Sequence, residues 1–342
     1  MNSVERFLAA CARSPVDRTP VWMMRQAGRY LPEYRAVRER VDFLTLCKTP
    51  QLAAQVSLQP IDRFGMDACI MFSDILIPVE AMGVPLAFTD AGPSLEGHIA
   101  SQADVDALRI PDPREAMPFV METLGLCARA LAGRAALIGF TGAPFTLATY
   151  IIEGRGSKNL AAAKSFMYSQ PRVFHALLDK LAAVIAEFAA AQAAAGAQAV
   201  QVFDTWAGEL DPASFDEFAR PYQSKVIERI RRSGVPAILY VNGCAGVLEL
   251  MAATGADVLS VDWRISLSDA RARVGPEFAL QGNVDPTVLL STPARTAEAA
   301  FAALESAGPT GHILNLGHGI LPQTPLECAA AFVGAPKAAV SA

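Results

Sequence analysis

Two arginines follow the first apolar run of the chain, four residues apart. The run ends in MMRQAGRY, which contains Arg25 and Arg29 with a glycine between them. An arginine is charged at any physiological pH, and its planar guanidinium suits a carboxylate or a phosphate. The pair therefore indicates a site for a ligand that carries several negative charges. The alternative is that each arginine pairs with an acid such as Asp74 or Asp262 and only stabilises the fold, and the two residues alone do not decide between these interpretations.

Four other side chains that could take part in catalysis or bind a ligand lie at or just beyond the end of an apolar run. Asp74 follows one such run and is either a catalytic carboxylate or the N-cap of a helix. Thr205 offers a hydroxyl to a ligand or caps the next helix, and Tyr150 contacts a ligand or packs at the edge of the core. His318 lies between two glycines, where it transfers or donates a proton or has only a structural role.

Eight short apolar runs are predicted to be the strands that carry these residues. Several lack polar alternation, which is typical of strands buried on both faces. Helical patterns separate the runs, most clearly at residues 179–196, 246–255 and 268–275, and each of these three ends in glycine. The eight runs are residues 19–24, 67–72, 135–140, 197–203, 236–241, 256–261, 277–282 and 312–317.

This alternation predicts an α/β fold, a (β/α)8 TIM barrel that forms one domain over residues 1–342. A doubly wound open sheet is the alternative, although no G-x-G-x-x-G follows the first run. Residues 89–113 are predicted to be a loop inserted between the second and third strands. Catalytic groups of such barrels lie at the carboxyl ends of the strands. The polar residues and glycines expected there are Arg25, Gln26, Gly28, Arg29, Ser73, Asp74, Thr141, Gly142, Asp204, Thr205, Asn242, Gly243, Asp262, Asn283, Asp285 and His318.

Composition excludes several classes of protein. Apolar residues make up 52% of the 342 residues and charged residues 18%, which suits a large folded core. With a net charge of −5 and no basic run, we expect neither nucleic acid nor a membrane surface as a partner. No apolar run approaches the ~20 residues that span a bilayer. The N-terminus does not read as a signal peptide.

Cysteine and histidine usage indicates a cytoplasmic protein without a metal. The six cysteines are scattered, and we expect free, mostly buried thiols in a reducing compartment. No H-x-x-x-H, H-x-C or clustered Cys/His set is present. The glycine-containing stretch at residues 153–159 does not have the spacing of a phosphate-binding P-loop, and no G-x-S-x-G nucleophile turn occurs.

These motifs together resemble the uroporphyrinogen decarboxylase family over essentially the whole chain. PVWMMRQAGRYLPEYR (20–35) looks like the N-terminal signature of the family, and GFTGAPFTLATYIIEG (139–154) looks like its second signature. Four shorter segments follow the order of the family: FSDIL (72–76), FDTWAGEL (203–210), GNVDP (282–286) and NLGHGILP (315–322). Each motif is weak alone, and the combination is specific.

The resemblance implies a (β/α)8 barrel, a homodimer, and neither metal nor organic cofactor. It implies removal of CO2 from the four acetate side chains of uroporphyrinogen III, giving coproporphyrinogen III. Arg25 and Arg29 match arginines that bind substrate carboxylates, and Asp74 matches the carboxylate that binds the pyrrole N–H groups. Tyr150, Thr205 and His318 match substrate-contacting positions, with threonine in place of the usual serine. Under this resemblance Asp74 and Arg25 are the catalytic candidates, and the substrate-binding candidates are Arg25, Gln26, Ala27, Gly28, Arg29, Asp74, Tyr150, Thr205 and His318.

The residues also fit the chemistry of a decarboxylation without a cofactor. Loss of CO2 leaves an electron pair that usually enters a cofactor. With none indicated, a pyrrole ring protonated on carbon has to accept it, and the carboxylate of Asp74 would stabilise that cation. Arg25 or a bound water is a candidate proton donor, although arginine is a poor acid. On its ordinary pKa, His318 is the better acid.

Two rival functions remain at this point. Methyltransferases that serve corrinoid proteins share the fold and usually carry a His-x-Cys…Cys zinc set, which the sequence lacks. A tetrapyrrole carrier would use the same residues to bind without releasing CO2.

Overall fold

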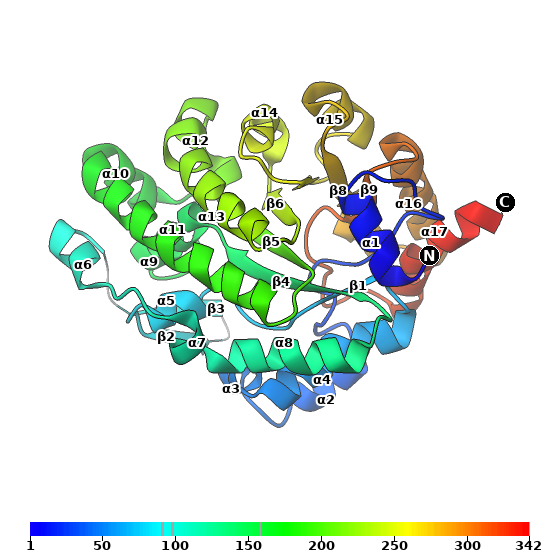
Figure 1. The fold of residues 1–342 in the computed structure, drawn as a ribbon, viewed down its shortest axis with the longest axis horizontal. Coiled ribbons are helices and arrows are strands. Elements are labelled where there is room, and N and C mark those ends of the chain that lie inside the picture. The colour runs from blue at the N-terminus through cyan, green and yellow to red at the C-terminus, as the bar shows by residue number, and fades with distance from the viewer. Residues whose placement is uncertain (90–91, 97–98, 158, 342) are drawn as a thin grey trace.

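Seven parallel strands form one curled sheet with helices packed outside it (Figure 1). The computed structural model describes residues 1–89, 92–96, 99–157 and 159–341. The strand order in the sheet is β1-β4-β5-β6-β7-β8-β9, which confirms the predicted α/β barrel class. The strands are β1 (Ala68–Ile70), β4 (Ala136–Gly142), β5 (Ala199–Asp204), β6 (Ala237–Val241), β7 (Val258–Ser260), β8 (Ala279–Val284) and β9 (His312–Leu316).

The eighth position of the barrel is filled by segment 20–24, which is not a regular strand. Val21 forms an isolated parallel bridge with Leu314 of β9. On its other side, the Asp67 N–H donates to the Val21 carbonyl at 2.8 Å. The prediction of a full strand at residues 19–24 was therefore wrong in detail. Pro20 has no N–H to donate, and the Val21 N–H donates to the carboxylate of Asp67 instead of to a neighbouring strand.

Helices fill the connections between the strands. Ten of the α-helices in the described chain have proline in their first turn, where its missing N–H costs nothing and its φ suits the helix. The α-helices are α1 (Ser3–Cys11), α2 (Pro32–Arg38), α3 (Phe43–Lys48), α4 (Pro50–Phe64), α5 (Ile77–Ala81), α6 (Gln102–Ala107), α7 (Pro113–Ala116), α8 (Pro118–Leu131), α9 (Pro144–Glu153), α10 (Ala161–Ser169), α11 (Pro171–Ala194), α12 (Pro212–Phe218), α13 (Arg220–Arg232), α14 (Leu248–Ala252), α15 (Leu267–Val274), α16 (Pro293–Ala307) and α17 (Leu326–Ser341). The described residues also form three 3-10 helices, η1 (Ala207–Glu209), η2 (Cys244–Gly246) and η3 (Pro286–Leu290).

The insertion between β1 and β4 carries more structure than the predicted loop at 89–113. Strands β2 (Leu86–Thr89) and β3 (Gly92–Leu95) form an antiparallel hairpin, and α6 follows it. The Leu95 N–H donates to the carbonyl of Gly154 at 2.8 Å, which docks the hairpin on the end of α9. The loop prediction was wrong because this docking partner lies far along the chain.

A layer of polar side chains crosses the inside of the barrel below the strand ends. The amide of Gln281 accepts from the Trp22 indole at 2.9 Å and donates to Ser260 at 2.9 Å and to Gln201 at 3.1 Å. All four residues are fully buried. These bonds tie the closing segment to β5, β7 and β8, because a buried polar group is costly unless it is paired.

Helix α1 covers the amino ends of the strands through a buried ion network. Asp67 lies directly before β1 and is fully buried. Its carboxylate accepts from Arg6 of α1 at 2.8 Å and from Arg18 at 2.6 Å, in addition to the Val21 N–H. The network joins α1, the closing segment and β1 at the end of the barrel opposite the predicted site.

The cysteine prediction is confirmed, since all six cysteines are free and buried. No helix of the described chain has the length and apolar character needed to cross a membrane.

We predict that Asp67→Ala lowers the free energy of unfolding by about 3–5 kcal/mol, because it leaves the mostly buried guanidinium of Arg18 without a counter-charge and that of Arg6 with Asp17 alone. The measurement is urea denaturation followed by circular dichroism. The control is Asp62→Ala, which breaks the exposed pair with Arg134 and should cost less than about 1 kcal/mol. Equal losses in the two variants would contradict this role of Asp67.

Candidate active site

Arg25 stands where the closing segment reaches the carboxyl ends of the strands. The backbone turns there, since the Gln26 N–H donates to the Met23 carbonyl at 3.0 Å. Arg25 has a φ of 62°, in the left-handed region that a residue with a side chain rarely adopts. Its side chain is exposed, and no acid of the described chain lies within ion-pair distance of its guanidinium. Arg25 therefore does not have the purely structural pairing with an acid that the sequence left open.

The three residues after Arg25 differ in what they offer to a ligand. Gln26 is fully buried, its amide donating to the carbonyl of Ala68 at 3.1 Å and accepting from the Met23 N–H at 3.2 Å. Its side chain is thus part of the barrel wall. Ala27 and Gly28 are half-buried. Substrate contact by Gln26, Ala27 and Gly28 stays a prediction.

Arg29 is the second exposed arginine of this segment. Its own carbonyl accepts from the guanidinium of Arg35 at 2.7 Å, and the Gly28 carbonyl accepts from the Leu31 N–H at 3.0 Å. The Arg29 guanidinium has no ion pair with an acid of the described residues. The local backbone is held while the charged group stays available to a ligand.

Asp74 lies four residues beyond the end of β1. Its carboxylate accepts from the Leu76 N–H at 2.8 Å, which stabilises the turn before α5 and matches the capping alternative in part. Burial raises the pKa of Asp74 to about 6, against the opposing effects of the Leu76 N–H and of the charge of Arg25. The second carboxylate oxygen has no hydrogen-bond donor within the described chain. Asp74 can therefore hold a structural bond and still accept from a ligand.

Tyr150 and Thr205 come from different elements and are joined by Trp206. Tyr150 lies on α9, and its ring packs edge-on against Trp206 with centroids 6.2 Å apart. Burial raises the pKa of Tyr150, a hydrogen bond with Trp206 and the charge of Arg25 lower it, and the charge of Asp74 raises it. Thr205 is half-buried directly before Trp206. Its contact with substrate stays a prediction.

His318 is held as a neutral imidazole. Its Nδ1 accepts from the Gly319 N–H at 2.6 Å, so the proton of the neutral ring is on Nε2. Burial lowers the pKa of His318 to about 4, and the charges of Arg25 and Arg264 lower it further. The comparison that made His318 a better acid than arginine used its ordinary pKa, and a ring with a pKa of about 4 carries no acidic imidazolium proton at neutral pH. At neutral pH the ring offers a hydrogen bond from Nε2.

Arg264 is a third cation at this end that the sequence reasoning missed. It pairs with the fully buried Asp262, and its guanidinium lies over the ring of Trp263, 4.6 Å from the centroid. Asp262 therefore pairs with Arg264 and not with Arg25 or Arg29. The signal was present, because the cation follows the predicted sixth strand by three residues.

Asp204 is a buried support for the Tyr150 side of the mouth. It accepts from the hydroxyl of Thr146 at 2.6 Å and from the amide of Gln223 at 2.7 Å. The same Thr146 hydroxyl accepts from the backbone N–H of Trp206 at 3.1 Å. Burial raises the pKa of Asp204 to about 6. The carboxylate fixes the backbone that carries Thr205 and Trp206.

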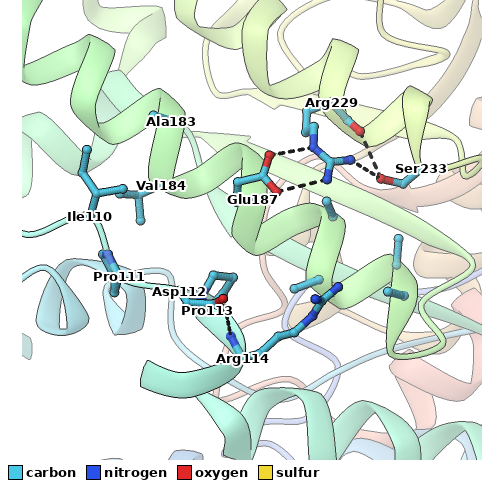
Figure 2. Close-up of a pocket in the computed structure, with 14 residues that line it drawn as sticks. Ile110, Pro111, Asp112, Pro113, Arg114, Ala183, Val184, Glu187, Arg229 and Ser233 are labelled. Carbon is cyan, nitrogen blue, oxygen red and sulfur yellow. Dashed lines mark hydrogen bonds and ion pairs between the residues drawn. The ribbon is translucent and has the colours of Figure 1, made fainter.

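A pocket of about 550 Å³ lies elsewhere, among outer helices (Figure 2). It is bounded by α7, α11 and α13, with the ion pair between Glu187 and Arg229 at 2.7 Å on one side. No predicted site residue lines it. The end of α11 that borders it leads into the amino end of β5, so the pocket faces away from the mouth.

Within the described ranges, no group of three or more His, Cys, Asp and Glu side chains could hold a metal ion. The candidate groups at the mouth are cations, carboxylates, hydroxyls and one neutral imidazole. Such a set suits the binding of a polyanion by charge and hydrogen bonding.

The fold and the position of these groups define a parallel α/β barrel with its polar groups at the carboxyl ends of the strands, the arrangement of barrel enzymes. A family model described as uroporphyrinogen decarboxylase matches residues 2–339. The chain belongs to the uroporphyrinogen decarboxylase family.

Several named proteins are similar in sequence to this chain over nearly its full length. A uroporphyrinogen decarboxylase of Geobacter metallireducens is 52% identical over 324 residues, covering 94% of this chain and 95% of that protein. One of Anaeromyxobacter dehalogenans is 49% identical over 341 residues, covering 97% and 98%. These relatives are carboxy-lyases.

Solved structures share the fold at lower identity. A methyltransferase from Methanosarcina mazei aligns with a TM-score of 0.84 and 24% identity, covering 99% of both chains. A B12-independent methionine synthase from Shewanella sp. W3-18-1 aligns with a TM-score of 0.58 and 12% identity, covering 94% of this chain and 93% of that one. At these identities the likeness shows the fold alone.

We predict that His318 is neutral at pH 7 and begins to protonate only below pH 5, because burial and two nearby cations disfavour the imidazolium. The measurement is 15N NMR of histidine-labelled protein, with the resonance assigned by its loss in His318→Gln. A neutral ring with its proton on Nε2 is expected. An imidazolium spectrum at pH 7 would show that the ring is exposed to solvent or faces a carboxylate.

Proposed function

We propose that this chain, as a single domain over residues 1–342, decarboxylates the four acetate side chains of uroporphyrinogen III. The product is coproporphyrinogen III with four molecules of CO2, in porphyrin and haem biosynthesis. Family membership over residues 2–339 supports the reaction. The observation that supports this site is that Arg25, which has no ion pair with a described acid, lies at the same end of the barrel as the half-buried carboxylate of Asp74.

Charge complementarity supports the choice of substrate. Uroporphyrinogen has eight carboxylates, and Arg25 and Arg29 present guanidinium groups that no acid of the described chain neutralises. A charge-assisted hydrogen bond contributes about 1.5–3 kcal/mol. A few such contacts are enough for micromolar binding. The neutral Nε2–H of His318 adds a donor that suits a carboxylate at the same mouth.

Asp74 supplies the opposite charge at the centre of the substrate. With a pKa of about 6, it is mostly ionised at pH 7 and accepts from pyrrole N–H groups through the oxygen that Leu76 leaves free. Protonation of a pyrrole carbon makes the ring cationic. The bond to CO2 then breaks, and its electron pair enters the ring and leaves an exocyclic methylene. A second proton converts that methylene carbon to methyl, and the ring carbon releases the proton it first took up, so each acetate consumes one proton net. A fixed carboxylate stabilises the cation as it forms.

No organic cofactor or metal takes part in this scheme, because the substrate ring is the electron acceptor. We also propose that the protein works as a cytoplasmic homodimer, which rests on the family. Sedimentation velocity at micromolar concentration tests the dimer independently of turnover.

Turnover tests the proposed function directly. Purified protein is incubated anaerobically with uroporphyrinogen III and a chelator, and the oxidised products are separated by carboxylate number. We expect seven-, six- and five-carboxylate intermediates before the four-carboxylate product. Persistence of the eight-carboxylate compound would exclude the decarboxylase. Tight binding without turnover would then indicate a carrier, and methyl transfer that requires zinc would indicate the other enzyme class.

We predict that Asp74→Asn lowers kcat by roughly 10²–10³ with little change in folding, because the amide still accepts from Leu76 but carries no charge. In the wild type, kcat/KM should fall tenfold per pH unit below about 6 as Asp74 protonates. Asp204→Asn is the matched control, since that carboxylate also has a pKa of about 6. The Asp204→Asn variant should still show the tenfold fall of kcat/KM per pH unit below about pH 6. Near-normal turnover by Asp74→Asn would remove Asp74 from the mechanism.

A further inference from the structure

Arg25 occupies a backbone conformation that its own residue type disfavours. A φ of 62° brings Cβ close to the following peptide in any residue other than glycine. Such a conformation persists only when the surrounding structure determines it. The contacts around Arg25 therefore matter for where its guanidinium points.

The backbone beside Arg25 is fixed by the segment that follows β9. The Met24 N–H donates to Oδ1 of Asn315 at 2.9 Å, and the Met24 carbonyl accepts from the Ile320 N–H at 2.9 Å. The same Asn315 oxygen accepts from the Leu316 N–H at 2.7 Å. Asn315 is fully buried. Both polar groups of the residue before Arg25 are thus held by one segment, 315–320.

The side chain of Arg25 runs across Gly319. A Cβ built on Gly319 would lie 2.7 Å from Cγ and 3.0 Å from Nε of Arg25, and closer still to Cδ. Carbon atoms do not approach this closely without displacement. Glycine at position 319 is therefore required for the observed path of the arginine side chain.

The segment is itself held from the far side. The Gly317 carbonyl accepts from the hydroxyl of Tyr240 at 2.9 Å, and the Gly317 N–H donates to Val284 at 2.8 Å. The ring of His318 packs edge-on against Tyr240, with centroids 6.1 Å apart. These contacts to β6 and β8 make the segment a fixed support and not a loop that would yield to Arg25.

We propose that segment 315–320 is a cradle for Arg25, in which Asn315 and Gly319 are positioning residues for the decarboxylation. Asn315 sets the backbone turn, and Gly319 leaves the path along which the guanidinium crosses the mouth. His318 belongs to the same segment, so the cradle fixes the cation and the neutral imidazole relative to each other. The role of the cradle in catalysis rests on the proposed function, whereas the contacts that position Arg25 are independent of it.

The test is a double-mutant cycle between Gly319→Ala and Arg25→Ala, with turnover of uroporphyrinogen III as the measurement. Gly319→Ala alone should lower kcat/KM at least tenfold while the urea midpoint changes little. In the Arg25→Ala background, Gly319→Ala should cost less than about twofold, because it acts through a side chain that is no longer there. Equal, additive losses in both backgrounds would overturn the proposal.

A matched control separates this effect from the general cost of replacing a glycine. Gly246 follows β6 at the same end of the barrel, and a Cβ there would meet no atom within 4 Å. Gly246→Ala should keep the turnover of the wild type. A loss as large as that of Gly319→Ala would show that any added methyl group at this end impairs the enzyme, and would count against the cradle.

Asn315 offers a second, independent pair of variants. Asn315→Asp keeps an oxygen that accepts from Met24 and should keep most of the turnover. Asn315→Leu has a similar size and no acceptor, and should resemble Arg25→Ala in its kcat. Equal activity of the aspartate and leucine variants would exclude positioning through the Met24 hydrogen bond.

A readout without substrate distinguishes the two proposals. The charges of Arg25 and Arg264 lower the pKa of His318, and the ring of Tyr240 packs edge-on against its imidazole. In Gly319→Ala the displaced cation should raise the pKa of His318, measured by 15N NMR, while Gly246→Ala leaves it unchanged. An unchanged His318 titration in Gly319→Ala would overturn the cradle even for an active enzyme. A shifted titration in a protein without turnover would keep the cradle and reject the decarboxylase.

Discussion

The hydrogen bonds that hold segment 20–24 between β9 and β1 are the constraint on which the rest of the site depends. They close a sheet of seven regular strands into a barrel, and they do so with a segment too irregular to form a ladder. Because the segment ends at the carboxyl end of the barrel, Arg25 emerges there, and Arg29 follows four residues later in the chain. The same segment is bonded by Asp67 at the opposite end, so one short stretch links the stability of the fold with the position of two cations.

Burial at the carboxyl end of the barrel raises the pKa of carboxylic acids and lowers the pKa of histidine, and both shifts have the same physical cause. Removal from water disfavours whichever form is charged. The pKa values of Asp74 and Asp204 accordingly rise to about 6, and that of His318 falls to about 4. Near neutral pH the site therefore combines an ionised carboxylate, a neutral donor and unpaired guanidinium groups. This combination suits a polyanion whose centre becomes positively charged during the reaction.

The barrel class and the positions of the strands were predictable because both follow from local pattern. Seven of the eight apolar runs overlap regular strands, and the eighth is the closing segment. The residues that follow those runs lie toward one end of the sheet, because the carboxyl ends of parallel strands meet there, and their contact with substrate stays a prediction. The hairpin β2–β3 was missed, since its packing on Gly154 depends on a contact that no local pattern reports.

By itself, the sequence determined the order of strands and helices, the family, and which polar residue follows each strand. These depend on hydrophobic periodicity and on residue types that lie next to one another. Only the tertiary structure decided that Asp262 pairs with Arg264, that His318 is neutral, and that Gln26 is buried in the barrel wall. Desolvation arises from segments far apart in the chain. Asp262 and Arg264 are only two residues apart, but the fold decides that this cation, and not Arg25 or Arg29, reaches the carboxylate. The bond from Met24 to Asn315, which joins residues 291 positions apart beside the left-handed Arg25, is such a case.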